Sequence, residues 1–268
     1  MLIDVRIAVL ILVVFTGYAA IGQPKQVETS HQAWMAWFHQ TRLSDRSGTW
    51  LDVQHRRAGD FIERPTVSLV RGGYSYYFSD LVSAQVGYAY VHFSFAGAAP
   101  SLHEHRPWQQ VQWMTRGRRL RTIQWVRAEQ RFREIEDRDY QFNWRFRQNI
   151  ALFFPFGHES AEWRPFLTAS NELHVNAGKN VQQNYFDQNR LFVGVGCYLG
   201  GASNIQLGYL NAFQQLATND RFVNVHAIRL AVVNNADWRS AKRIKASGQL
   251  RRRRLSTFRK IQLSSRTF

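Results

Sequence analysis

The chain has 268 residues, of which 45% are hydrophobic and 14% aromatic, and its formal net charge is +16. Its single cysteine, Cys197, excludes an intramolecular disulfide and argues against a small secreted scaffold held together by disulfides. Most of this charge lies in the tail, since residues 236–268 hold eleven Lys or Arg and one Asp, a net charge of +10. A charge concentrated in a tail does not indicate a nucleic-acid-binding surface on the rest of the chain.

The N-terminus carries the pattern of a secretory signal peptide. Nine apolar residues, Ile7–Phe15, are too few to span a bilayer but suit the apolar region of a signal. Ala20–Gly22 then gives the small-x-small pattern that precedes a cleavage site. Asp4 departs from the pattern because it cancels the charge of Arg6, and the alternative is a buried N-terminal strand or helix. We expect residues 1–22 to be a cleaved signal peptide.

The rest of the chain predicts long strands. No later segment has 18 apolar residues in a row, so no transmembrane helix is expected. Hydrophobic residues instead alternate with polar ones in eleven runs, most of them long enough for the 9–11 residues of a tilted transmembrane strand. The runs are Gln32–Arg42, Thr49–Arg57, Pro65–Phe78, Val82–Phe93, Glu104–Met114, Leu120–Arg133, Tyr140–Phe154, Pro165–Asn176, Phe186–Leu199, Asn204–Gln215 and Phe222–Val233.

The two faces of these runs differ sharply in polarity. In Tyr140–Phe154, one face is aromatic and aliphatic, with Phe142, Trp144 and Phe146, whereas Arg145 and Arg147 lie on the other face. A soluble barrel places its apolar face inside, and the pattern alone does not say which face is in. Long strands with bulky aromatic faces behind an export signal favour apolar residues outside and polar residues inside.

Aromatic residues near the run ends suggest interfacial girdles. Many fall near predicted strand ends, as Trp34, Trp50 and Trp163 do, and Trp37 follows Trp34 within the same run. Such rings suit a membrane interface because their bodies are apolar while the indole N–H can stay hydrated. Ordinary core packing is the alternative for any one of them.

The connections alternate between short and long, as in outer-membrane barrels. The connection between Tyr140–Phe154 and Pro165–Asn176 is the exception, since it is long where a short turn is expected. Eleven strands would make the first and the last run in the same direction, so they could not close as an antiparallel pair. Bacterial single-chain barrels have an even strand number, and we therefore expect a single antiparallel up-and-down transmembrane β-barrel of about 12 strands. The predicted barrel occupies residues 23–235, and a basic tail follows at residues 236–268, which we expect to be disordered.

Charged clusters recur at alternate positions of several runs. They include Glu104–Arg106, Arg127–Phe132 and Arg145–Arg147, with Gly87 before them and Gly208 after them. In order and spacing, residues from Gln32 to Val233 resemble domain of unknown function 2490, a family of uncharacterised outer-membrane proteins of Gram-negative bacteria. The resemblance implies an outer-membrane β-barrel and carries no established activity. The basic tail departs from the family, whose last strand normally ends the chain.

We expect the clustered charges to meet inside the barrel, because a lone buried charge is costly and must be paired. Their role is either structural, fixing strand register through cross-strand pairs, or solute-contacting, with excess arginine favouring an anionic solute. The predicted lumenal residues are Glu104, Arg106, Gln110, Arg127, Glu129, Arg131, Arg145, Arg147, Glu172 and Arg190.

Signals for an enzyme or a metal site are weak. The chain has no G-x-S-x-G motif, and His103 and His105 form a ligand doublet without a recognisable third ligand, since His158 lies far along the chain. We therefore expect no catalytic residues, no metal and no cofactor. The predicted partners are outer-membrane lipid and the barrel-assembly machinery. Two alternatives stay open: an outer-membrane enzyme acting on lipid or lipopolysaccharide, and a soluble periplasmic ligand-binding β-protein.

Overall fold

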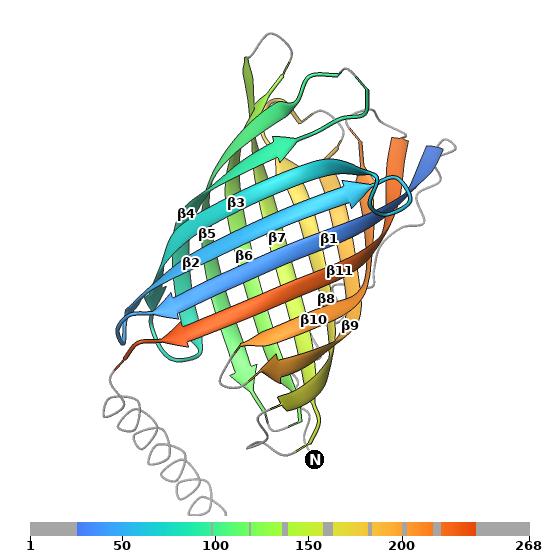
Figure 1. Cartoon of the computed structure of the whole chain (residues 1–268). Coiled ribbons are helices and arrows are strands. Elements are labelled where there is room, and N and C mark those ends of the chain that lie inside the picture. The colour runs from blue at the N-terminus through green and yellow to red at the C-terminus, as the bar shows by residue number, and fades with distance from the viewer. Residues whose placement is uncertain are drawn as a thin grey trace, which may run out of the picture.

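Eleven long strands form one closed barrel (Figure 1). The computed structural model describes residues 26–97, 99–117, 119–135, 139–157, 163–181, 184–199, 203–216 and 221–239. The predicted all-β barrel is confirmed, and the strand centres agree with the predicted runs. The strands are β1 (Gln26–Arg42), β2 (Ser47–Ala58), β3 (Arg64–Tyr77), β4 (Val82–Phe93), β5 (Leu102–Arg116), β6 (Arg121–Glu134), β7 (Tyr140–Pro155), β8 (Trp163–Ala177), β9 (Phe186–Leu199), β10 (Asn204–Gln215) and β11 (Arg221–Asp237).

The barrel closes through a parallel pair of strands, contrary to the twelve-strand expectation. Each strand pairs with its sequence neighbours in antiparallel fashion, but β1 and β11 run side by side in the same direction (Figure 1). Their register extends from Gln26 opposite Arg221 to Arg42 opposite Asp237. An odd number of alternating strands leaves the first and last parallel, and their pairing satisfies two otherwise open edges. The described residues contain no twelfth strand.

The closing strands are longer than their apolar pattern predicted. β1 begins at Gln26, six residues before the predicted run, and β11 ends at Asp237, beyond the predicted barrel boundary at residue 235. Polar residues can extend these strands because backbone pairing between β1 and β11 needs no apolar alternation. The predicted signal peptide and residues 240–268 of the predicted tail lie outside the described residues.

The two ends of the barrel differ in their connections. At one end, residues 43–46, 78–81, 117–120 and 200–203 join successive strands, and residues 156–162 form the longer exception predicted from the sequence. We call this the short-turn end. At the other, the long-loop end, the connections are residues 59–63, 94–101, 135–139, 178–185 and 216–220. The strand β1 therefore starts at the long-loop end, and β11 finishes at the short-turn end.

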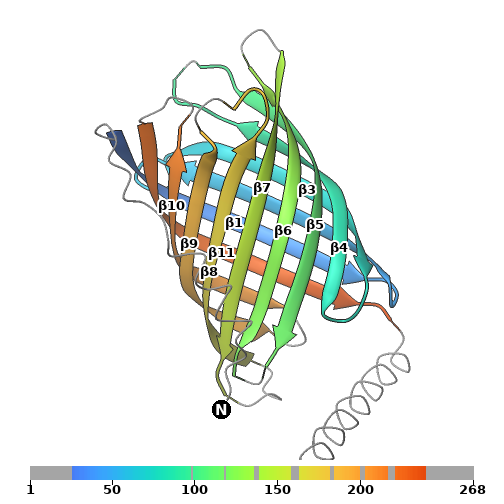
Figure 2. The same cartoon turned by 180° about the vertical axis from the view of Figure 1, so that it is seen from behind.

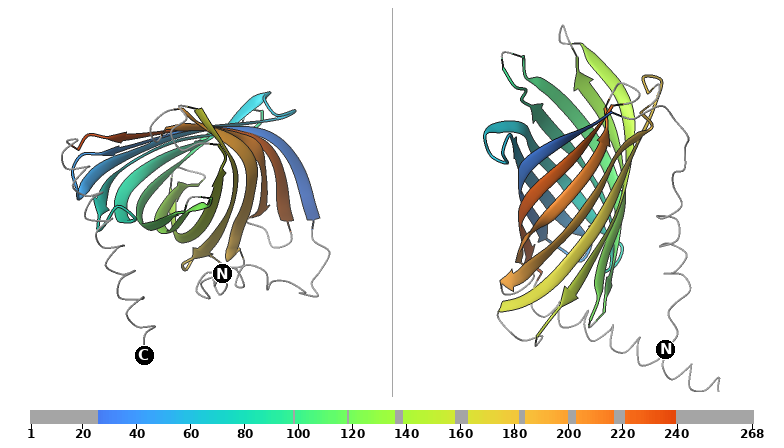
Figure 3. Two further views of the ribbon diagram at one scale, coloured as in Figure 1. Left: turned by 90° about the horizontal axis from the view of Figure 1, so that it is seen from below. Right: turned by 90° about the vertical axis from the view of Figure 1, so that its right-hand side faces the viewer.

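The outer surface of the barrel is apolar. In β9, Leu191, Val193 and Val195 are exposed, whereas Phe192 between them is buried. The strands enclose a common interior when seen from behind (Figure 2) and from below (Figure 3, left). Alternation therefore places large apolar side chains outside and mostly polar ones inside.

Two of the predicted girdle tryptophans instead face the interior. Trp34 is buried, while Trp37 is exposed on the outer surface. The two are three residues apart, so the period of two forces them onto opposite faces. Trp50 also faces inward, where its ring meets Trp108 edge-on at 5.8 Å between centroids. Aromatic content alone therefore does not tell which tryptophans face outward. The position of each one in the alternation of its strand does.

Candidate functional site

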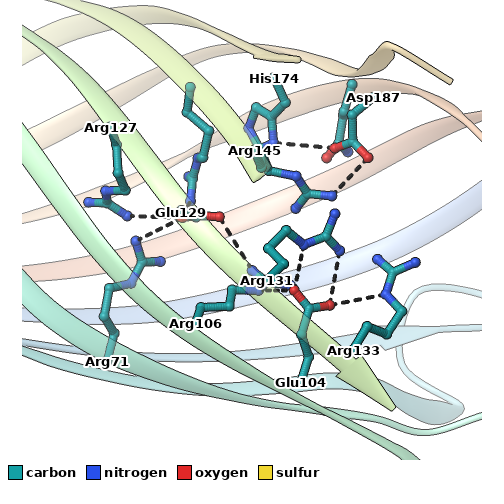
Figure 4. Close-up of polar contacts among 12 residues, drawn as sticks. Arg71, Glu104, Arg106, Arg127, Glu129, Arg131, Arg133, Arg145, His174 and Asp187 are labelled. Atoms are coloured by element: carbon teal, nitrogen blue, oxygen red, sulfur yellow. Dashed lines mark hydrogen bonds and ion pairs between the residues drawn. The ribbon is translucent and has the colours of Figure 1, made fainter. Parts of the chain in front are cut away.

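The polar interior is an ion-pair network carried mainly by β5 to β9 (Figure 4). All ten residues predicted to be lumenal have a polar contact with another residue of this interior. They meet because inward positions alternate along each strand and neighbouring strands bring these positions to similar heights. We call these ten residues, together with Asp52, Arg71, Arg133, His174, Asn176 and Asp187, the lumenal network.

Glu104 anchors the end of the network that is nearer the long loops. Its carboxylate accepts two hydrogen bonds from Arg131, at 2.5 and 2.9 Å, and a further one from Arg106. Arg133, directly opposite on β6, donates at 3.1 Å. The Glu104 side chain is completely buried. One fully buried carboxylate therefore neutralises part of the charge of three guanidinium groups, of which Arg106 and Arg131 are buried and Arg133 is partly exposed.

Glu129 lies at the centre of the network. Arg147 donates to its Oε1 at 2.6 Å, and Arg127 approaches the same oxygen to 3.7 Å. Arg71 from β3 and Arg106 from β5 each lie 3.9 Å from a Glu129 oxygen. Four arginines from four strands thus surround one buried carboxylate, which links the wall from β3 to β7; Figure 4 labels three of them, Arg71, Arg106 and Arg127.

Glu172 and Asp187 complete the acidic side of the network. Arg147 donates to Glu172 as well as to Glu129 and so bridges the two carboxylates. Asp187 accepts from Arg145 at 2.8 Å, and His174 lies between Glu172 and Asp187, at 3.1 and 3.6 Å. The side chain of His174 is almost completely buried.

The partners within the network differ from those that strand order alone predicts. Arg131 does not share Glu129 with Arg127; it pairs with Glu104 on the neighbouring strand. Likewise Glu129 stands directly opposite Arg145, yet its short contact is with the diagonal residue Arg147. Long arginine side chains reach diagonal neighbours easily, so register alone does not select the partner.

Sequence reasoning missed several members of the network. Asp52 on β2 pairs with Arg71 on β3 at 3.2 Å, and the two stand opposite each other in register. Both lie at alternate positions of predicted strands, but each is a single charge among uncharged neighbours. Asp187 was missed as a lumenal residue because a register shift beside His174 and Val175 interrupts the simple alternation. The signal that could have revealed Asp52 and Arg71 is their place at alternate strand positions that face the interior.

Trp108 fills the lumen beside the network, and two glycines make room for it. A Cβ at Gly87 would lie 2.6 Å from the Trp108 ring and 2.2 Å from the carbonyl oxygen of Gly72. A Cβ at Gly73 would lie 2.9 Å from the same ring. The guanidinium carbon of Arg127 stands 4.7 Å from the ring centroid, a cation–π distance. Side chains rather than water therefore occupy this level of the barrel.

The network carries a net positive charge. Five carboxylates, those of Asp52, Glu104, Glu129, Glu172 and Asp187, are in ion-pair contact with eight arginines. The side chains of Glu104, Glu129 and Arg131 are at most 2% exposed, so no water-filled passage runs past them. The arrangement can hold neighbouring strands in register and close the lumen. Its surplus of arginine N–H donors can also bind an anion.

The histidine doublet lies outside the lumen. The ring of His103 is hydrogen-bonded to the hydroxyl of Tyr90 at 2.5 Å, and that of His105 is hydrogen-bonded to Tyr88. Tyr88 and Tyr90 are exposed on the outer surface. Within the described ranges, no group of three or more His, Cys, Asp or Glu residues could hold a metal ion. His158 lies outside the described residues.

One contact on the outer surface was not visible as a sequence motif. Nδ1 of His55 on β2 lies 3.0 Å from Oγ of Ser68 on β3, and the two residues are partners in register. They are 13 residues apart in the sequence, so no local motif could reveal the pair. Among the described residues, no carboxylate forms a hydrogen bond with His55.

Comparison with known proteins supports one assignment. Searches of curated proteins and of solved structures each found no match. In the described part of the chain, no helix has both the length and the apolar character needed to cross a membrane. The family model "Protein of unknown function (DUF2490)" matches residues 31–223, which extend from β1 into β11. The chain therefore belongs to the family of proteins of unknown function DUF2490.

Proposed function

We propose that the chain is an integral outer-membrane β-barrel, exported with the signal peptide at residues 1–22, whose lumen is closed by the lumenal network. Its role is structural, or it is a narrow transporter with a gated interior; it is not an open pore. In this arrangement the apolar outer surface contacts lipid, and the barrel-assembly machinery inserts the chain.

The observation that carries this proposal is the reversal of ordinary burial. Large apolar side chains such as Phe146, Val193 and Val195 are about half exposed, at 47%, 54% and 56%, while Glu104 and Arg131 between the walls are buried. A water-soluble barrel would gain stability from the opposite arrangement, because apolar surface is favourable only away from water. A lipid environment stabilises the observed one.

Fractionation of cells that express the full chain tests this proposal. We expect the protein in the outer-membrane fraction, retained through an alkaline carbonate wash and released only by detergent. N-terminal sequencing should begin at Gln23. A soluble periplasmic β-protein would appear in the osmotic-shock fluid without detergent. Recovery there, or in the cytosol with Met1 retained, would contradict the proposal.

A second candidate function is favoured by the pair of Ser68 and His55. The Ser68 hydroxyl can donate its proton to His55 Nδ1, which is the arrangement of a nucleophile and its general base. Both residues lie on the outer surface toward the long-loop end of β2 and β3. A site there would face lipid head groups, so the corresponding activity is hydrolysis of a lipid or lipopolysaccharide ester.

Release of fatty acid from phospholipid or lipopolysaccharide vesicles tests the second candidate. If the pair is catalytic, the parent chain releases fatty acid, and Ser68→Ala lowers the rate by about 10²-fold or more. Ser30→Ala, which removes another partly buried hydroxyl from β1, serves as the control and should keep the full rate. The candidate fails if the parent chain releases no fatty acid, or if both variants retain the parent rate.

A further inference from the structure

The half of the lumen nearer the short-turn end contains a chamber of about 1130 Å³. Its wall extends from Trp34, central in β1, and its register partner Arg56 to Arg42 and Gly117 near the short turns. Glu104 and Arg131 do not line it; they lie beyond its inner end, where the lumen is closed. The chamber is slightly larger than the roughly 300–1,000 Å³ of typical small-molecule sites, so a small solute fits inside it.

The wall of the chamber is strongly positive. Its four carboxylates are already engaged: Asp52 with Arg71, Glu172 with Arg147, Asp80 with Arg42 and Asp237 with Arg239. The pKa of Arg239, which follows β11, is raised because its guanidinium donates to the Asp237 carboxylate. Ten arginines line the same wall: Arg42, Arg56, Arg71, Arg116, Arg121, Arg127, Arg147, Arg190, Arg229 and Arg239.

Three of these arginines lie over the neighbouring rings of Trp34 and Phe192 at the inner end. Trp34 has Arg56 on β2 and Arg229 on β11 as its two partners in register. The guanidinium carbon of Arg56 stands 3.8 Å from the Trp34 ring centroid, and that of Arg190 stands 5.1 Å from it. Arg229 lies 4.7 Å from the ring of Phe192. Each guanidinium therefore lies over an aromatic ring at a cation–π distance, and this contact uses none of its N–H groups, which can still donate to an acceptor.

These three arginines are poorly supplied with anions. Within the described residues, Arg56 and Arg229 form no ion pair, and Arg190 reaches only Glu172, at 3.7 Å. The buried polar atoms of the wall that lack a hydrogen-bond partner are all donors. They are Trp50 Nε1, Arg56 Nε, Arg71 Nε and Arg190 Nε. Buried donors without acceptors are unfavourable, so the chamber is complementary to a group that brings several acceptors and negative charge.

We propose that the inner end of the chamber binds the phosphate group of a solute that enters from the short-turn end, with Arg56, Arg190 and Arg229 as its main ligands. A phosphate dianion offers oxygens in several directions and so suits three guanidinium groups that come from different strands. A planar monocarboxylate, by contrast, has only two oxygens, and one or two guanidinium groups are enough to satisfy them. The phosphate site requires only the folded barrel. It can therefore be absent from a barrel that does lie in the outer membrane, and it can be present in a barrel that does not.

Titration calorimetry on the full chain in uncharged detergent micelles tests this site. The probes are inorganic phosphate, glycerol phosphate and acetate, compared at one ionic strength. We expect phosphate or its ester to bind one site per chain, and acetate to bind at least about tenfold more weakly. Tighter binding of inorganic phosphate would identify the free ion as the ligand, and tighter binding of glycerol phosphate would identify an ester. Either result supports a phosphate site.

Substitutions locate the site within the chamber. Arg229→Gln is expected to weaken phosphate binding by about tenfold or more, and Arg56→Gln provides the same test if the first variant does not fold. Arg64→Gln removes an exposed arginine outside the chamber and should leave the affinity unchanged. The proposal is wrong if no phosphate probe binds, if acetate binds equally well, or if Arg64→Gln causes the same loss as Arg229→Gln.

Discussion

Replacing Glu104 by alanine is expected to lower the free energy of unfolding by about 3–5 kcal/mol, because breaking a buried ion pair leaves its partner charges uncompensated. Three arginines depend on this one carboxylate: Arg106, Arg131 and Arg133. Arg131 would lose both hydrogen bonds that hold its guanidinium, and its next acceptor is Asn176, at 3.5 Å. The loss is large because the Glu104 carboxylate and the Arg131 guanidinium are almost completely buried.

Urea unfolding in detergent micelles, followed by tryptophan fluorescence, measures this effect. Glu28→Ala is the matched control, since Glu28 pairs with Arg221 on the surface and an exposed pair contributes only about 0–1 kcal/mol. Adding Arg131→Gln to Glu104→Ala should recover part of the stability, because it removes one orphan cation. Equal stabilities of the Glu104 and Glu28 variants would mean that Glu104 is hydrated and that the network does not close the lumen.

Replacing Val193 by arginine is expected to cost about 2–4 kcal/mol in lipid if the residue lies near the bilayer midplane. Val193 is central in β9, its side chain is 54% exposed, and its neighbours in register are Ala169 and Tyr209. The cost arises from placing a cation in hydrocarbon, and no internal contact of the barrel is lost. Unfolding of the barrel in phospholipid vesicles measures it.

The control for Val193→Arg is the same change at Val27, which is similarly exposed but lies at the long-loop end of β1. There the expected cost is about 0–1 kcal/mol, because the charge reaches the interface. If both variants are as stable as the parent chain in lipid, the exposed apolar face does not contact hydrocarbon, and the membrane proposal loses its main support.

The strands and their two faces could be predicted from the sequence because both depend on local alternation. The run Tyr140–Phe154 became β7, Tyr140–Pro155, and Arg145 and Arg147 lie on its inner face. Strand number and closure could not be predicted, since they depend on how β1 and β11 meet. Those strands are nearly 200 residues apart in the chain, and their polar ends carry no pattern.

The members of the candidate site were easier to predict than their pairing. Clusters such as Arg127–Arg131 reveal inward charges because three alternate positions are charged together. Isolated charges such as Asp52 give no such signal, although burial and a 3.2 Å contact with Arg71 make it part of the network. Partner choice among long side chains depends on the curvature of the closed wall, which local sequence does not encode.

Single-channel recording tests the closed, ion-paired lumen most directly. The purified barrel is reconstituted into vesicles, flotation and protease protection establish that it is inserted, and the same preparation is fused with a planar bilayer. We predict no steady current, because Glu104, Glu129 and Arg131 lie inside the barrel with at most 2% of each side chain exposed, as expected where the lumen is closed. A large, steady current through the inserted parent chain would contradict the account, since it would require an open water-filled path past these buried ion pairs.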